Sequence, residues 1–135
     1  MMDPDTSAGQ GVSGREVRVT EGTIATRRVR ALARTYSCPV ERTLAVVGAK
    51  WTLQIIRDLI DGPRRFSELE RSLRGASPKV ISARLRELER LGLVSRAAYP
   101  EVPPRVVYSL TAHGRSFRPI IESLRTWGRA LEKAS

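Results

Sequence analysis

The side chains best suited to chemistry in this chain lie between residues 77 and 86. Lys79 and Arg86 can bond phosphate oxygens or guanine edges, and Ser82 can bond a base or a phosphate. Ala83 adds a small side chain to the same surface. A helix that presents small and basic residues near its N-terminus suits the major groove of DNA. The alternative is an amphipathic helix whose outer face is simply solvated.

The residues around this group predict a helix over 78–91 with a signal at each end. Ser77 is a good N-cap, and Pro78 fits the first helical position. Gly92 suits the left-handed residue that ends a helix, and Leu93 can pack back onto the last turn. The residues at helical spacing that predict a buried face are Ile81, Leu85, Leu88 and Leu91.

Apolar spacing predicts three shorter helices before this one. They cover residues 39–47, 50–60 and 67–73. Ser67 and Glu70 fit a capping box at the start of the third of these helices. A turn at residues 74–76 then leads into the helix over 78–91, which is the order of elements in a helix-turn-helix.

After the long helix the apolar pattern changes to a period of two, which predicts a β-hairpin. Its strands cover residues 93–98 and 105–110, and the proline-rich loop between them covers 99–104. A hairpin directly behind such a helix is a wing. Thr111 caps a last helix, which Pro119 should kink or split. The apolar stripe of that helix comprises Phe117, Ile120, Ile121, Leu124, Trp127 and Leu131.

The composition indicates one small basic domain. Among 135 residues, 24 Lys and Arg face 14 Asp and Glu, which gives a net charge of +10. This balance indicates a nucleic-acid partner or, less often, an anionic membrane. A biased genomic composition would explain the preference for Arg over Lys, but not the excess of bases over acids. No apolar run approaches the roughly 20 residues that cross a bilayer, and we expect a cytoplasmic protein.

The first part of the chain carries weaker signals. Residues 1–22 lack apolar periodicity, and we expect them to be disordered. They contain a Gly-x-Gly-x-x-Gly pattern at 9–14, which we reject as a dinucleotide site because no strand precedes it. Residues 23–36 are basic, and three interpretations stay open: an arm that touches DNA phosphates, a loosely held helix, or a dispensable leader.

Several short stretches occur together in an order typical of one family. They are Cys38–Glu41, Gly48–Trp51, Gly62–Leu69, Ser82–Leu88, Gly92–Val94, Pro103–Thr111 and Gly114. On these stretches the chain resembles the HxlR-type winged helix-turn-helix transcriptional regulators of bacteria, which are MarR-like. The resemblance implies an α+β, mainly helical fold. It places the winged helix-turn-helix domain, with its terminal dimerisation helices, at residues 36–135, after an extension over 1–35.

The resemblance also implies a homodimer that binds double-stranded DNA. Its dimer interface would include Val40, Leu44, Phe117, Ile121, Leu124, Trp127 and Leu131. The expected function is a sequence-specific transcriptional regulator acting on an inverted-repeat operator. Two other functions remain open: a winged-helix module that binds proteins, and a non-specific architectural DNA-binding protein. A small-molecule effector is possible, but no residue indicates one.

The expected DNA-binding residues come from four segments. They are Arg64, Arg65, Ser67, Ser77, Pro78, Lys79, Ser82, Ala83, Arg84, Arg86, Arg96 and Arg105. Arg64 and Arg65 precede the third helix and are suited to phosphate, whereas Arg84 lies nearer the flank and is suited to the DNA backbone. Arg96 and Arg105 flank the wing, where the minor groove or its phosphates would be met. For each of them the alternative is a solvated charge.

Cys38, the only cysteine, is a candidate redox sensor. It stands at a helix start beside Pro39, where backbone N–H groups and the helix dipole favour a thiolate. Arg34 and Arg42 would act in the same direction. In several members of the family a cysteine at this place senses oxidants or electrophiles. The alternative is a small buried residue without reactivity.

The remaining candidates point away from enzymes and cofactors. Trp51 and Trp127 fall on apolar stripes, so we expect core or dimer packing and not ligand stacking. His113 stands alone, without a second ligand at metal-binding spacing. The sequence shows no pairing of a nucleophile with a base and no credible phosphate loop. We therefore expect no catalysis, no metal and no cofactor.

Overall fold

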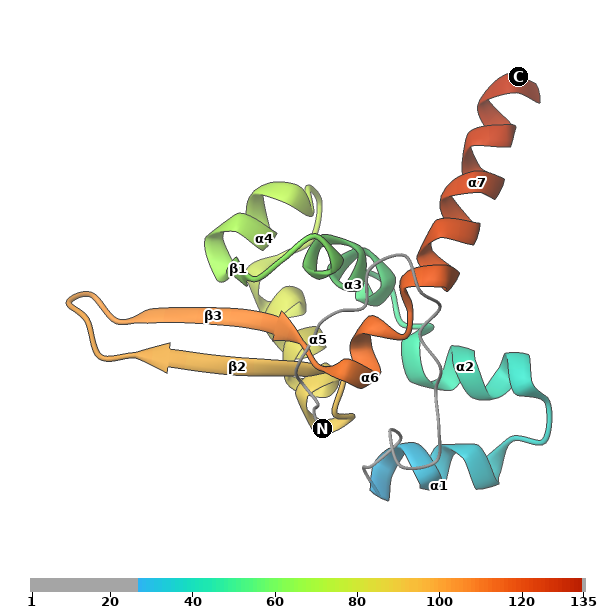
Figure 1. The fold of residues 1–135 in the computed structure, drawn as a ribbon, viewed down its shortest axis with the longest axis horizontal. Helices are drawn as coiled ribbons and strands as arrows, with labels where there is room; N and C mark the ends of the chain where they lie inside the picture. The colour runs from blue at the N-terminus through green and yellow to red at the C-terminus, as the bar shows by residue number, and fades with distance from the viewer. Residues whose placement is uncertain (1–26, 135) are drawn as a thin grey trace.

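The structure is a computed structural model, and it describes residues 27–134. Its elements in chain order are α1 (Arg27–Thr35), α2 (Pro39–Val47), α3 (Thr52–Ile60), β1 (Arg64–Arg65), α4 (Phe66–Ser72), α5 (Pro78–Arg90), β2 (Val94–Tyr99), β3 (Arg105–Leu110), α6 (Ala112–Arg115) and α7 (Arg118–Ala134). The glycine pattern at 9–14 and the disorder expected for residues 1–22 lie outside the described residues. Figure 1 shows the β2–β3 hairpin extending away from the helices, with α7 projecting from the opposite end.

The fold is the predicted winged helix-turn-helix, mainly helical with one small antiparallel sheet. The sheet has the order β1-β3-β2, and its register pairs Tyr99 with Arg105 and Val94 with Leu110. Strand β2 therefore extends one residue further towards the wing than the predicted strand over 93–98, and the wing loop begins at Pro100. The core lies where α3, α4 and α5 meet the sheet. Its fully buried side chains are Ile55, Ile56, Leu69, Leu73, Ile81, Leu85, Leu88, Leu91 and Leu93.

Both predicted ends of α5 are confirmed. The Ser77 hydroxyl accepts a hydrogen bond from the Val80 N–H at 3.2 Å. At the other end Gly92 adopts φ +80°, a conformation that side chains disfavour. The N–H of Leu93 then donates to the Leu88 carbonyl at 2.9 Å, which completes a Schellman motif. Local sequence signals therefore fix where this helix begins and ends.

The predicted start of α4 is wrong. The helix begins at Phe66, and the Glu68 carboxylate accepts from the Arg65 N–H at 2.8 Å. Ser67 thus lies inside the first turn, and the expected Ser67–Glu70 capping box does not form. The physical reason is β1, which pairs Arg65 with Val107 and leaves the helix to start at the next residue.

Thr111 and Gly114 place α6 against the residues at the start of β2. The Thr111 hydroxyl caps α6 by accepting from the Gly114 N–H at 3.1 Å, and it donates to the Gly92 carbonyl at 2.6 Å. A Cβ at Gly114 would stand 2.2 Å from the Leu93 carbonyl oxygen, so this close approach requires glycine. Pro119 lies in the first turn of α7, and the last helix is split from α6 as predicted.

Candidate nucleic-acid interface

The outer face of α5 carries a polar pair next to a lysine. Lys79 and Arg86 are exposed, and Ser82 and Ala83 are half-buried. The Arg86 Nη1 donates to the Ser82 hydroxyl at 2.8 Å, which directs the guanidinium along the helix surface. In the part of the chain that the structure describes, no carboxylate pairs with Lys79 or Arg86. These cations therefore remain available to an external anion.

The opposite face of α5 anchors the helix firmly. Ile81, Leu85 and Leu88 are each at most 1% exposed. Arg84, on the flank, donates its Nε to the Lys50 carbonyl at 2.8 Å and so joins α5 to the residues before α3. Arg84 therefore helps to position α5, in addition to the DNA-backbone contact that stays a prediction.

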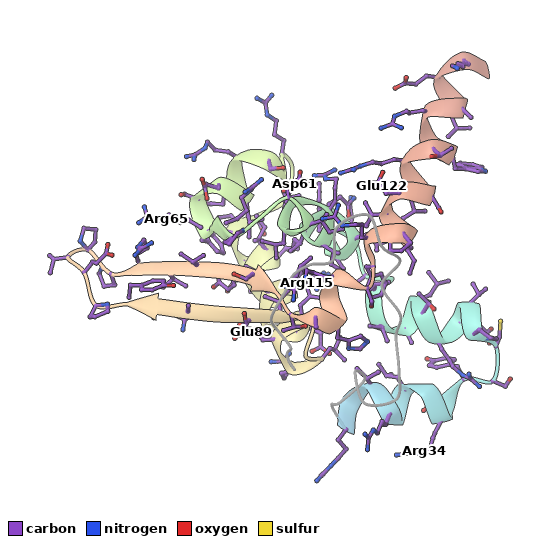
Figure 2. All side chains as sticks on the ribbon, in the orientation of Figure 1. Arg34, Asp61, Arg65, Glu89, Arg115 and Glu122 are labelled. Carbon is purple, nitrogen blue, oxygen red and sulfur yellow. The ribbon has the colours of Figure 1, made fainter. Side chains whose placement is uncertain are left out.

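Further cations lie on β1 and in the turn before α5. Arg64 is half-buried and donates to the Pro63 carbonyl at 3.1 Å, whereas Arg65 and Ser67 are exposed. Figure 2 shows Arg65, the last residue of β1, on the surface next to α4. Arg74 is exposed too, in the turn between α4 and α5, although it was not among the predicted site residues. Its position inside the helix-turn-helix was the signal that could have identified it.

One of the two cations predicted for the wing, Arg105, is paired within the wing itself. The Arg105 guanidinium forms an ion pair with Glu101 at 2.8 Å and lies 4.2 Å from the centre of the Tyr99 ring. Arg96, on β2, is exposed and forms no ion pair with any described residue. Val102 is fully exposed at the tip of the wing. Arg96 is therefore the wing cation that is free to meet phosphate.

Cys38 is the N-cap of α2, and its thiol is exposed, so the alternative of a buried cysteine is wrong. The backbone N–H groups of Glu41 and Val40 point at the sulfur and lower the pKa of the thiol below its ordinary value. The charge of Arg42 also lowers this pKa, more weakly, whereas desolvation of the thiol raises it. The site therefore favours a thiolate that reagents can reach.

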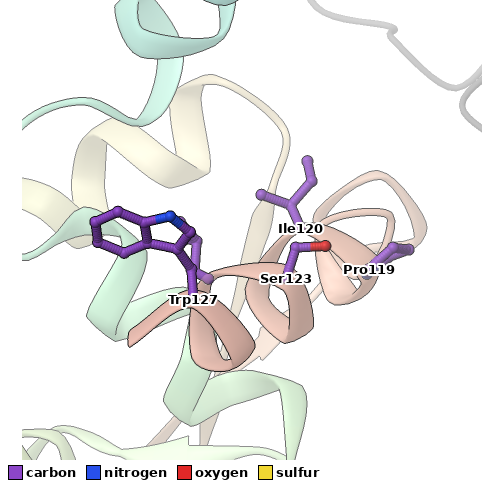
Figure 3. Close-up of a pocket in the computed structure, with 5 residues that line it drawn as sticks. Pro119, Ile120, Ser123 and Trp127 are labelled. Carbon is purple, nitrogen blue, oxygen red and sulfur yellow. The ribbon is translucent and has the colours of Figure 1, made fainter. Parts of the chain in front are cut away.

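The last helix buries one side and exposes another. Phe117 and Ile121 are buried in the core of their own subunit. A second row of apolar side chains recurs at helical spacing along α7 and is exposed: Ile120, Leu124, Trp127 and Leu131. Val40 and Leu44 of α2 are exposed as well. Figure 3 shows Trp127, Ser123 and Ile120 along α7, where they line a shallow open groove. Two residues of the predicted dimer interface, Phe117 and Ile121, are thus buried within the chain itself, and the interface formed by the exposed ones stays a prediction.

The two tryptophans have different environments. Trp51 packs against the core and close to Gly75, which confirms the expected packing role. Trp127 is 68% exposed, so it does not serve the core of its own subunit. His113 is half-buried, and this burial lowers its pKa. The described residues hold no group of three potential metal ligands and no helix long and apolar enough to cross a membrane.

Residues 46–135 match the family model of the HxlR-like helix-turn-helix. Among known relatives, the HTH-type transcriptional regulator YdeP of Bacillus subtilis strain 168 is 43% identical over 91 residues, which cover 67% of this chain and 71% of that protein. The solved structures include a regulator from Enterococcus faecalis V583 assigned to the MarR family. It has a TM-score of 0.62 and 37% identity, and the match covers 70% of this chain and 86% of that one.

A second solved structure, the redox regulator HypR in its reduced form, is also similar. Its TM-score is 0.68 and its identity 40%, and the match covers 72% of this chain and 96% of that one.

Proposed function

We propose that this chain, which belongs to the HxlR-like helix-turn-helix family of transcriptional regulators, binds an inverted-repeat operator as a homodimer. The observation that carries the proposal is the outer face of α5, where Lys79 and Arg86 stand exposed, with Arg86 bonded to the half-buried Ser82, on a helix anchored by buried apolar side chains. A protein of this function works in the cytoplasm, where bacterial DNA lies.

In the proposed complex α5 enters the major groove with its N-terminal half against the bases. Arg86 is suited to a guanine edge, Ser82 to a base or phosphate, and Ala83 to a thymine methyl group. Ser77 and Pro78 would bring the positive end of the helix close to the DNA backbone. The residues proposed for phosphate are Lys79, Arg64, Arg65, Ser67, Arg84 and Arg96. Arg105 would act mainly by stiffening the wing through Glu101 and Tyr99.

The proposed dimer buries the exposed apolar residues of α2 and α7 against a second copy. Trp127, Leu124 and Leu131 are at least about half exposed in the isolated chain, which leaves a large apolar area in water. A two-fold interface would cover the same residues on both subunits. It would also set the two α5 helices about 34 Å apart, which is one turn of DNA.

Regulation through Cys38 is part of the proposal. The relative HypR is a redox regulator, and the exposed thiol at the start of α2, whose pKa is lowered by backbone N–H groups, supports a similar response here. Two Cys38 thiols brought together by the dimer would give two electrons and two protons to hydrogen peroxide. The products would be one disulfide and two water molecules. An electrophile would instead alkylate each thiolate separately.

The experiment is a binding titration with DNA from upstream of the gene, compared with random DNA of equal length, before and after treatment with peroxide. Preference for the upstream DNA supports the operator, and a change on oxidation supports sensing. A ratio of affinities near one would favour a non-specific architectural protein. Absence of binding to either DNA would favour a module that binds proteins.

A further inference from the structure

The helix α1 precedes the family-matched residues and has two contrasting faces. Val29 is only 7% exposed and Leu32 packs against the same core, so this face is held by the body of the protein. Arg27, Arg30 and Arg34 are exposed. At about 100° per residue these three arginines fall within roughly 60° of one another, on the face opposite Val29 and Leu32. Figure 2 places Arg34 on the side of α1 that faces away from α2.

Among the described residues, no acidic side chain forms an ion pair with this row of arginines. Helix α1 contains no acidic residue, and the four ion pairs formed among described residues lie elsewhere. The row extends from Arg27 to Arg34, which is about 10 Å along the axis, and so covers nearly two helical turns. Three fixed cations over this distance fit a line of phosphates better than a single small anion.

The row is also held at a defined place. The Arg42 side chain donates its Nε to the Tyr36 carbonyl, which fixes the turn between α1 and α2. Figure 1 shows α1 beside α2, at the end of the molecule opposite the tip of the wing. A helix docked by its apolar face cannot insert that face into a lipid surface, because membrane binding by an amphipathic helix requires it to be free.

We propose that Arg27, Arg30 and Arg34 of α1 form a second DNA-binding surface, which holds backbone phosphates outside the bases contacted by α5. The proposal rests on the DNA-binding function proposed above. The row lies on a helix outside the helix-turn-helix and remote from the wing, so we assign its arginines to phosphates and not to base edges. It therefore adds affinity that is independent of sequence and does not alter the choice of operator.

The test uses the full chain with the triple substitution Arg27→Gln, Arg30→Gln and Arg34→Gln. A matched control neutralises three cations of α7, through Arg125→Gln, Arg129→Gln and Lys133→Gln, and so changes the net charge equally. Binding to operator and random DNA is measured over a range of salt concentrations. A third variant, with lysine at the three α1 positions, keeps the charge.

We expect the α1 glutamine variant to flatten the dependence of log K on log salt by up to about 2.7 per subunit, at roughly 0.9 per lost phosphate contact. Both DNAs should be affected alike, with the ratio of their affinities unchanged. The lysine variant and the α7 control should keep the slope of the unmodified protein.

An unchanged slope in the α1 glutamine variant would overturn the proposal, as would an equal loss in the α7 control or a loss confined to the operator. If the unmodified protein itself fails to prefer the operator, the proposed function is what fails. Circular dichroism of each variant verifies that the helices are intact.

Discussion

Arg86 and Arg64 show how two cations of one surface can have separate functions. Arg86 stands on the outer face of α5 and is bonded to Ser82, so its guanidinium is held along the exposed surface of the helix. Arg64 is half-buried in β1 and donates to the adjacent Pro63 carbonyl, outside α5. Residue type alone predicted both as DNA-binding, because sequence shows charge but not orientation. The structure supplies the hydrogen bonds that separate their proposed roles.

We therefore expect Arg86→Ala to weaken operator binding by about 1–3 kcal/mol and to relax the preference at one base pair. Arg64→Ala should weaken binding to all DNA sequences alike and reduce the salt slope by about 1. Fluorescence anisotropy with operator and scrambled duplexes measures both quantities. Equal losses on the two duplexes for both variants would argue against this division of roles.

The pKa of the Cys38 thiol is lowered by the N–H groups of Glu41 and Val40, and this has a kinetic consequence. Because the thiolate is the nucleophile, its alkylation should reach half of the maximal rate at a lower pH than alkylation of free cysteine. Following iodoacetamide labelling of the native protein from pH 5 to 10 gives this midpoint. A midpoint at or above that of free cysteine would contradict the proposed sensor.

At the scale of elements, those with local end signals could be predicted and those made by distant pairing could not. Ser77 and Gly92 mark the ends of α5 in the sequence itself, and both act there as expected. Strand β1 has two residues and exists only through its pairing with Tyr108 and Val107, so no alternation reveals it. Missing this strand misplaced the start of α4, which begins directly after Arg65.

The C-terminal end of α5 provides a test of its geometry. Gly92→Ala places a side chain at φ +80° and should lower the free energy of unfolding by about 1 kcal/mol. Gly128→Ala is the matched control, because it lies inside α7 where a Cβ meets nothing within 4 Å. That control should stabilise α7 by roughly 0.5–1 kcal/mol. Urea denaturation measures both, and a neutral or stabilising Gly92→Ala would show that the left-handed stop is not required.

At the scale of the whole molecule, the apolar stripe of the last helix divides into a buried part and an exposed part. Phe117 and Ile121 complete the core, whereas Leu124 and Trp127 are exposed and belong to the proposed dimer interface. Sequence periodicity could not divide them, because all four fall on the same broad arc of a helix. The division depends on where α3 packs against α7, which is a tertiary contact.

The proposed dimer predicts that Trp127→Glu raises the dissociation constant of the dimer at least about tenfold, since it places a charge in an apolar interface. Arg129→Glu, on the same helix, provides the control for added negative charge and should have less effect. Sedimentation equilibrium of the two variants and the unmodified chain measures the change. A monomeric unmodified chain, or a dimer indifferent to Trp127→Glu, would remove α7 from the interface.

Footprinting of the DNA upstream of the gene tests the central claim most directly, because it reports where a pair of α5 helices lies. We expect two protected segments in inverted repeat, with centres about 10 base pairs apart. Both segments should be lost together when Lys79 and Arg86 are replaced by alanine. Uniform protection without defined segments, or protection that survives the double substitution, would contradict the assignment of α5 as the helix that reads the operator.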